Sequence, residues 1–304
     1  MKQTSGEDAL TDQSVPVPAI PRLVAASGVK MSDEEFRQVR QYIYQQCGIY
    51  FPDNKKYLLE GRLGKRLQVR DIPSFEAYMH LLKYGARRQE EMRFFYEAIT
   101  INETFFFRNE PQFEAFEQTL VSSVLASRGS STGKLRVWSA ASSSGEEAYS
   151  IGMLFLEKIK PRYPGLEIEI IGTDINEAVI ETARKGVYRE YSVRNMPKYY
   201  LDKYFLTDDS RYYLRDEVKH LVRYETLNLY DKARMRMMMN VDIIFCCNVL
   251  IYFDAQSKIQ VVSNLYDSLR RGGFLFIGYA ESLHGISTAF KLINFTKTVA
   301  YKKE

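Results

Sequence analysis

The stretch from Lys134 to Asp174 constrains the fold of this chain more than any other. Its pattern predicts an apolar strand around Val137, a loop of small residues, a long helix, and a second apolar strand that ends at Asp174. A strand, a helix and a strand in this order make a right-handed crossover, so the two strands lie parallel in one sheet. Ligands of such sheets bind where the strands end. The sequence therefore predicts an α/β fold, with Asp174 placed to bind a ribose diol.

The loop at residues 139–145 reads SAASSSG and differs from a dinucleotide-binding loop. It has no bulky side chain, so a flat ligand can approach the backbone, and Gly145 can adopt whatever dihedral angles the turn needs. The G-x-G-x-x-G loop instead places a pyrophosphate at a helix N-terminus. Here the helix opens with Glu146 and Glu147, which disfavour a phosphate and favour a cation. S-adenosylmethionine, a phosphate-free cationic nucleoside, fits this pattern; two acids that only complement the helix dipole are the alternative.

Composition excludes several classes of protein. The 304 residues, 45% of them hydrophobic, can bury the cores of two domains. The net charge of +4 is too small to predict a nucleic-acid partner. No apolar run approaches the roughly 20 residues of a membrane helix, and the N-terminus does not resemble a signal peptide. The 3 cysteines lack metal-site spacing and fit a reducing compartment. We expect a soluble cytoplasmic protein that neither binds a metal nor inserts into a membrane.

The chain divides into segments of different character. Residues 1–30 are rich in Pro, Ser, Thr and charge, and we predict a disordered leader. Residues 31–98 show helical periodicity and predict an all-helical N-terminal domain. Residues 99–126 are expected to link the domains and cover the binding site. Residues 127–304 predict the α/β domain, and short alternating runs within 187–220 predict a small β-insertion on its sheet.

Local patterns add detail to these segments. A capping box at Ser32 begins the first helix. In the second helix, about residues 55–70, the inward candidates are Tyr57, Leu58, Leu63 and Leu67. Short strands are expected at Arg211 to Arg215 and at Lys219 to Glu225, and residues 221–227 should also re-enter the main sheet. Asp254 can cap a helix from Ala255 to Arg270 that Gly272 and Gly273 end, followed by a strand from Phe274.

The second helix also places Arg62, Lys65, Arg66 and Arg70 close to one outward face. A row of basic side chains is often only a solvated surface. The alternative is docking onto an acidic partner, where such charges raise the association rate more than the affinity. Nucleic acid is disfavoured, because no recognition motif accompanies the row.

Two further groups of polar residues point to a binding site. Asn102, Thr104 and Arg108 surround three phenylalanines, and this pattern predicts a segment laid over a site, with an interdomain linker packed by its phenylalanines as the alternative. Asn228 and Asn248 follow predicted strands, as Asp174 does. Since the carboxyl ends of parallel strands meet at one edge, we expect these polar side chains to converge there.

Six motifs in this order resemble those of the chemoreceptor glutamate methyltransferase family, CheR, over residues 32–304: ITINETFFFR, VWSAASSSGEEAYSI, IIGTDIN, LNL, IIFCCNVLIYFD and GGFLFIGYAES. The resemblance implies a helical domain followed by a Rossmann-like methyltransferase sheet that carries a β-subdomain insertion. It implies methyl transfer from S-adenosylmethionine to glutamates on the cytoplasmic helical bundle of chemotaxis receptors. The products are glutamate γ-methyl esters and S-adenosylhomocysteine, and the process serves sensory adaptation.

The resemblance also implies roles for particular residues. The implied cofactor contacts are Asn102, Thr104 and Arg108 at the methionyl end, Ala140 and Glu146 on the methionine side, Asp174 at the ribose, and Asn228, Leu229, Asn248 and Val249 around the adenosine. Arg128 and Tyr266 are candidates for positioning the substrate. The row of Arg62, Lys65, Arg66 and Arg70 is then expected to contact the acidic receptor helix.

One departure from the family concerns the β-insertion, which reads LTDDSRYYLRDE without the glycine of members that tether to a receptor's C-terminal pentapeptide. This departure favours direct docking on the receptor helices over tethering. Three other functions are conceivable for such a sheet. An exocyclic-amine methyltransferase is disfavoured because Asn248 is not followed by two prolines, and a nicotinamide dehydrogenase by the two acids at the helix start. A nonenzymatic signalling adaptor that binds the cofactor or its product remains the alternative.

Overall fold

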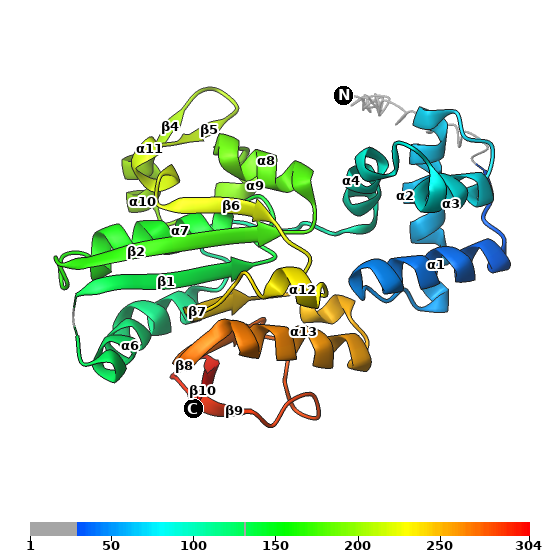
Figure 1. The fold of residues 1–304 in the computed structure, drawn as a ribbon. Helices are drawn as coiled ribbons and strands as arrows, with labels where there is room; N and C mark the ends of the chain where they lie inside the picture. The colour runs from blue at the N-terminus through cyan, green and yellow to red at the C-terminus, as the bar shows by residue number, and fades with distance from the viewer. Residues whose placement is uncertain (1–28, 131) are drawn as a thin grey trace, which may run out of the picture.

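The computed structural model describes residues 29–130 and 132–304, so residues 1–28 of the predicted leader lie outside the described residues. The described part of the chain runs from a group of helices through an extended segment to an α/β part built on a seven-stranded sheet (Figure 1). No helix among the described residues has both the length and the apolar character that a membrane crossing requires.

The helical domain packs its helices around one apolar core. Its helices are α1 (Asp33–Cys47), α2 (Lys56–Arg70), α3 (Phe75–Tyr84) and α4 (Arg88–Ile99), with a short 3₁₀ helix (Asp53–Lys55) before α2. The predicted capping box is confirmed, because the Ser32 hydroxyl accepts from the Glu35 amide and the Glu35 carboxylate accepts from the Ser32 amide. The predicted start of the domain therefore rests on two reciprocal hydrogen bonds.

The buried face of α2 differs in part from the prediction. Leu63 and Leu67 are fully buried as expected, but Tyr57 is 63% exposed and Leu58 is only half-buried. Leu59, which was not predicted to face inward, is fully buried in the core instead. Positions 59, 63 and 67 repeat at intervals of four residues and form one helical stripe, whereas Tyr57 lies on a different face.

The basic row on α2 is mostly bound to its own domain. The Arg66 Nη2 donates to Glu91 Oε2 at 2.7 Å, and the Arg70 Nε lies 3.4 Å from the same oxygen. Glu91 is buried on α4, so Arg66 neutralises a charge that would otherwise be unpaired. The Arg62 Nη1 faces the carbonyls of Ile99 and Thr100, at 3.4 and 3.3 Å. Lys65 is exposed.

The main sheet has the strand order β6-β2-β1-β7-β8-β10-β9. The parallel strands are β1 (Gly133–Ala140), β2 (Leu166–Asp174), β6 (Val222–Thr226), β7 (Val241–Cys246) and β8 (Leu269–Ile277), and the antiparallel ones are β9 (Phe290–Asn294) and β10 (Val299–Lys303). The chain leaves β1 toward β2 on one side, while β7 pairs with β1 on the other. This reversal of strand order places a ligand site at the carboxyl end of β1.

Helices cover both faces of the sheet and enclose two apolar cores (Figure 1). One core includes residues of α5 (Glu110–Ala115), α6 (Val121–Arg128), α7 (Glu146–Leu154) and α8 (Glu177–Lys185), with π-helical turns at Phe116–Leu120 and Phe155–Ile159. The other includes residues of α12 (Lys232–Met235), a 3₁₀ turn (Leu250–Tyr252) and α13 (Ala255–Ser268). The fold is thus the predicted Rossmann-like α/β sheet preceded by an all-helical domain.

The predicted β-insertion contains a second sheet with the order β3-β5-β4. Its strands are β3 (Val187–Tyr188), β4 (Phe205–Thr207) and β5 (Tyr212–Leu214). Helices α9 (Glu190–Val193) and α10 (Lys198–Tyr204) lie between β3 and β4 in the chain, and α11 (Asp216–Lys219) follows β5. The prediction of an insertion strand from Lys219 to Glu225 is wrong. Lys219 ends α11, and residues 222–226 form β6 of the main sheet.

The predicted end of α13 is also wrong. The helix stops at Ser268, and Gly272 and Gly273 lie inside β8, where its register with β7 shifts. Gly272 has φ 82°, and a Cβ on Gly273 would lie 2.9 Å from the Asp242 carbonyl oxygen. The two glycines therefore serve a strand irregularity rather than a helix end.

The end of α1 docks against the α/β part. Gly48 has φ 73°, and an added Cβ would lie 2.6 Å from Cδ2 of the Tyr230 ring. Two hydrogen bonds flank this contact, one from Asn228 Nδ2 to the Gln46 carbonyl at 2.7 Å and one from the Tyr50 amide to the Tyr252 carbonyl at 2.9 Å.

Replacing Gly48 with alanine should lower the free energy of unfolding by about 1–3 kcal/mol, since a left-handed alanine is strained and its methyl group displaces Tyr230. Chemical denaturation measures the change. Gly129→Ala is the matched control, because Gly129 also ends a helix with φ 65° but its Cβ would meet nothing within 4 Å. Equal losses in both variants would show that the Tyr230 contact contributes nothing.

Candidate cofactor site

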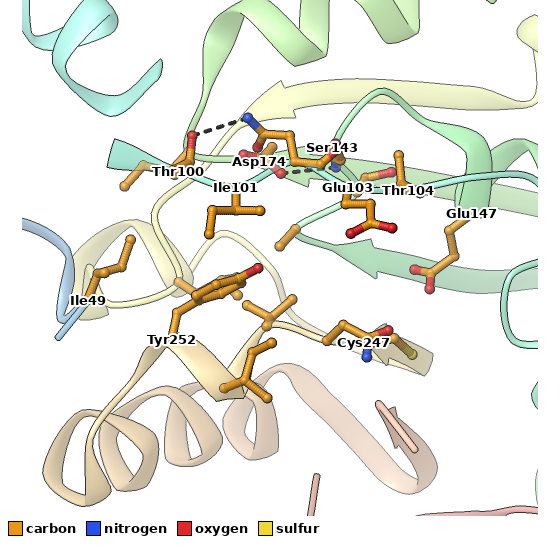
Figure 2. Close-up of a pocket in the computed structure, with 18 of the residues that line it drawn as sticks. Ile49, Thr100, Ile101, Glu103, Thr104, Ser143, Glu147, Asp174, Cys247 and Tyr252 are labelled. Carbon is orange, nitrogen blue, oxygen red and sulfur yellow. Dashed lines mark hydrogen bonds between the residues drawn. The ribbon is translucent and has the colours of Figure 1, made fainter. Parts of the chain in front are cut away.

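A cavity of about 270 Å³ lies where the helical domain, the extended segment and the carboxyl ends of the strands meet (Figure 2). Its lining includes residues that follow β1, β2, β6 and β7, as the strand-end pattern predicted. From the predicted cofactor contacts, the cavity brings together Asn102, Thr104, Arg108, Asp174, Asn228, Leu229, Asn248 and Val249. The predicted convergence of polar strand-end residues at one edge of the sheet is therefore found in the structure.

Asp174 ends β2 with its carboxylate fixed by the backbone. The amide of Ser143 donates to Oδ2 at 3.0 Å (Figure 2), and the amide of Asn176 donates to Oδ1 at 2.9 Å. The residue is 6% exposed. Burial raises the pKa of Asp174 to about 6, against the lowering effect of these backbone hydrogen bonds. A ligand hydroxyl that donates to this carboxylate would supply a partner that burial has removed.

Glu147, on the first turn of α7, extends into the cavity (Figure 2). Its Oε1 accepts from the Ser139 hydroxyl at 2.7 Å, and burial raises its pKa to about 7. The adjacent Glu146, which was the predicted cofactor contact, does not line the cavity. Its side chain is buried, with the residue 1% exposed, and its carboxylate accepts from the hydroxyls of Ser144 and Ser192 at 2.8 and 2.9 Å. Adjacent residues on a helix point in different directions, so only one of the two acids can reach the ligand.

Three residues without glycine's freedom adopt left-handed backbone conformations around the cavity. They are Ala141 with φ 60°, Ser143 with φ 51° and Asn248 with φ 63°. Such conformations are uncommon for residues with a side chain and concentrate at binding sites. In the loop after β1 they turn the Ser143 amide toward Asp174.

The extended segment that carries Asn102 lies against the loop after β1. The Ser143 hydroxyl donates to the Asn102 carbonyl at 3.0 Å, and the Arg108 Nη1 donates to the Glu103 carbonyl at 2.6 Å. Phe106 and Phe107 are buried in the sheet core. The segment thus combines both predicted roles, because its phenylalanines anchor it while its polar residues line the cavity.

Besides Glu146, the structure places three further predicted site residues away from the cavity. Ala140 is buried within the core of the sheet. Arg128 pairs with the buried Asp242 at the amino-terminal edge of the sheet. Tyr266 packs edge-on against Phe290, with ring centroids 5.0 Å apart. The last two side chains have structural partners and do not line the cavity.

Other lining residues had no signal in the sequence. The helical domain contributes Ile49, Tyr50 and Phe51, and the loop after β7 contributes Ile251 and Tyr252, whose ring forms part of the cavity wall (Figure 2). Ile49, Tyr50 and Phe51 reach the cavity only because the helical domain docks there, whereas Ile251 and Tyr252 follow β7 in the same loop as Asn248 and Val249. Glu147 could have been considered with Glu146, since both open the helix after β1, and its hydrogen-bond partner Ser139 lies next to the last residue of β1.

The charges of the cavity favour a cationic ligand. Among the described lining residues, Arg108 is the one basic side chain, whereas Glu103, Glu147 and Asp174 are acidic. A diphosphate would meet more negative than positive charge here. A nucleoside with a cationic tail matches both the apolar walls and the acids.

Comparisons with known proteins agree with this geometry. Residues 34–100 match the model of the CheR methyltransferase all-alpha domain, and residues 102–299 match that of the CheR methyltransferase SAM binding domain. The chain is 37% identical to chemotaxis protein methyltransferase 2 of Vibrio cholerae, over 90% of this chain and 94% of that protein. It is 33% identical to the chemotaxis protein methyltransferase of Escherichia coli, over 86% and 89%. The chain belongs to the CheR methyltransferase family.

Proposed function

We propose that this protein transfers a methyl group from S-adenosylmethionine to glutamate side chains of chemotaxis receptors, giving glutamate γ-methyl esters and S-adenosylhomocysteine. The observation that carries the proposal is the cavity in which Asp174 and Glu147 face a common space between apolar walls. Membership of the CheR family supports the same activity. The domain boundaries proposed with it are 31–98, 99–126 and 127–304, with the insertion at 187–220.

The residues present fit S-adenosylmethionine on chemical grounds. Asp174 offers a fixed carboxylate for the ribose hydroxyls, and Leu229 and Val249 offer apolar walls for the adenine. Glu147 supplies negative charge for the cationic tail, with Asn102 and Thr104 as polar partners. Asn228 lines the same space, although its side chain already bonds to the Gln46 carbonyl and the Tyr230 amide.

The reaction requires positioning more than acid–base catalysis. A glutamate with an ordinary pKa of about 4.3 is already ionised at neutral pH and needs no general base. S-adenosylmethionine supplies an activated methyl group on its sulfonium. The cavity residues hold donor and acceptor in line and exclude water, and such alignment can lower the barrier by roughly 7–11 kcal/mol. Arg108, the basic residue among the described lining residues, would contact the methionyl end of the cofactor.

The proposed partner is the glutamate-bearing helical bundle of a receptor, met directly by α2 rather than through tethering of the receptor tail. Of the basic row, Lys65 is the residue suited to a test, because Arg66 and Arg70 also hold Glu91. Lys65→Glu should slow receptor methylation about threefold at low salt, with a smaller effect at high salt. Initial rates measure this, and Lys83→Glu, also an exposed helical lysine, is the control. Equal rates in all three proteins would exclude the contact.

The proposed reaction is tested by incubating the protein with methyl-labelled S-adenosylmethionine and membranes that contain chemotaxis receptors. We expect label on the receptor that base releases as methanol, since esters hydrolyse in base and methylamines do not. Base-stable label would point to an amine methyltransferase. Cofactor binding without any label on the receptors would favour the nonenzymatic adaptor.

A further inference from the structure

Glu281 makes an unusual set of contacts beside the cavity without lining it. Its carboxylate accepts three backbone amides, from Gly278 at 2.5 Å, from Asn248 at 3.0 Å and from Ile251 at 3.1 Å. The first two amides donate to Oε2 and the third to Oε1. Hydrogen bonds to a charged acceptor are stronger than those between neutral groups.

These three amides belong to two neighbouring strand ends. Asn248 and Ile251 lie in the loop that follows β7, and Gly278 directly follows β8, which pairs with β7. Asn248 and Ile251 line the cavity, as do Val249 between them and Tyr252 after them. One carboxylate thus fixes the cavity-facing loop after β7 to the end of the next strand.

The loop needs such a restraint because of its backbone. Asn248 has φ 63°, a left-handed conformation that residues with side chains adopt uncommonly. Gly278 allows close approach: a Cβ there would lie 2.7 Å from both the Asn248 nitrogen and the Glu281 Oε2. The same loop meets the helical domain, where the Tyr252 carbonyl accepts from the Tyr50 amide at 2.9 Å.

We propose that Glu281 is a positioning residue for the cofactor, which it serves by holding the loop from Asn248 to Tyr252 in its binding conformation. The inference rests on the proposed function, because it assumes that S-adenosylmethionine occupies the cavity. Loss of the carboxylate frees the three amides and lets the left-handed turn at Asn248 relax. The wall beside the adenosine is then no longer preformed, and binding must also order the loop.

The test compares Glu281→Ala and Glu281→Gln with a matched control. Asp208→Ala removes a carboxylate that likewise accepts three donors, the amides of Ser210 and Arg211 and the hydroxyl of Tyr213, in the turn between β4 and β5. For each protein, calorimetry gives the Kd of S-adenosylhomocysteine, kinetics give KM for S-adenosylmethionine and kcat, and thermal denaturation gives the Tm.

We expect Glu281→Ala to raise the Kd and KM for the cofactor about tenfold or more, because the three amides lose their charged acceptor and binding must then also order the loop. The kcat at saturating cofactor should change much less. Glu281→Gln keeps one acceptor oxygen and should recover most of the affinity. Asp208→Ala should lower the Tm but leave Kd and KM at the values of the unmodified protein.

Outcomes separate this inference from the proposed function. If the unmodified protein fails to bind S-adenosylhomocysteine, the proposed function is wrong. If it binds, and Glu281→Ala shows a lower Tm with unchanged Kd and KM, Glu281 has only a structural role and the inference is overturned. Gly278→Ala provides a second route, since its Cβ should disrupt the same contacts and raise the Kd while the carboxylate stays.

Discussion

Replacing Asp174 with asparagine should weaken binding of S-adenosylmethionine on the order of a hundredfold, because hydrogen bonds from the ribose diol to a carboxylate contribute roughly 1.5–3 kcal/mol each. Asparagine offers one acceptor oxygen in place of two. Its amino group must also face the amide of either Ser143 or Asn176, which now donate to the carboxylate. Calorimetric titration at pH 7.5 measures the change in Kd.

The stability of the Asp174→Asn protein provides the control. Burial raises the pKa of Asp174 to about 6, above its ordinary value, so ionisation of this group costs stability at neutral pH. The neutral asparagine avoids this cost, which offsets part of the loss of backbone hydrogen bonds. We therefore expect a folded protein with poor binding. A Kd within twofold of the unmodified protein would mean that the ribose lies elsewhere.

Replacing Glu147 with glutamine should weaken cofactor binding about ten- to hundredfold at pH 7.5. Two unit charges 4 Å apart interact by roughly 4 kcal/mol at an effective dielectric constant of 20, and desolvation offsets part of that energy. Glutamine has nearly the same shape and can still accept from the Ser139 hydroxyl. The loss therefore reports the charge of Glu147 rather than its packing, and it should be smaller for S-adenosylhomocysteine, which lacks the sulfonium.

The pH dependence of binding separates the two acids. Burial raises the pKa of Glu147 to about 7 and that of Asp174 to about 6 in the free protein. A cationic ligand binds the ionised form of Glu147, so affinity should fall about tenfold per pH unit below 7 and more steeply below 6. In the Glu147→Gln protein, the part of the decrease in affinity between pH 7 and pH 6 that is due to Glu147 should disappear. An unchanged pH profile would mean that Glu147 does not face the charge of the ligand.

The same substitution should stabilise the ligand-free protein. The folded state keeps the Glu147 proton up to a pKa of about 7, whereas the unfolded state releases it near 4.5. Stability from this proton is present at low pH and is lost as the pH rises from 4.5 to 7. At pH 8, Glu147→Gln should therefore be more stable by as much as about 3 kcal/mol. Denaturation at pH 5 and pH 8 measures the difference, which should be small at pH 5.

The sequence was sufficient to predict the sheet and the edge at which the site lies. The succession of apolar strand, small-residue loop and helix between Lys134 and Asp174 depends on local sequence patterns and on the handedness of the crossover. The structure has the predicted parallel pairing of β1 with β2. The polar residues at strand ends converged for the same reason. Asp174, Asn228 and Asn248 line one cavity because parallel strands present their carboxyl ends together.

Other features depend on contacts that no local pattern specifies. Glu146 and Glu147 are adjacent and chemically identical, and only the direction of α7 decides which one enters the cavity. Gly272 and Gly273 resemble a helix end, but the register shift between β7 and β8 requires them inside a strand. Arg66 seemed a free surface charge because its partner Glu91 lies on another helix. Each error arose where tertiary packing decided between locally equal choices.

The acidic cavity is expected to select a cationic nucleoside that carries no phosphate. The most direct test is calorimetric titration of the protein with S-adenosylmethionine, S-adenosylhomocysteine and NAD at pH 7.5. We predict binding of the first two at one site per chain, abolished or strongly weakened in Asp174→Asn, and no binding of NAD. Binding of NAD in preference to S-adenosylmethionine would contradict the account.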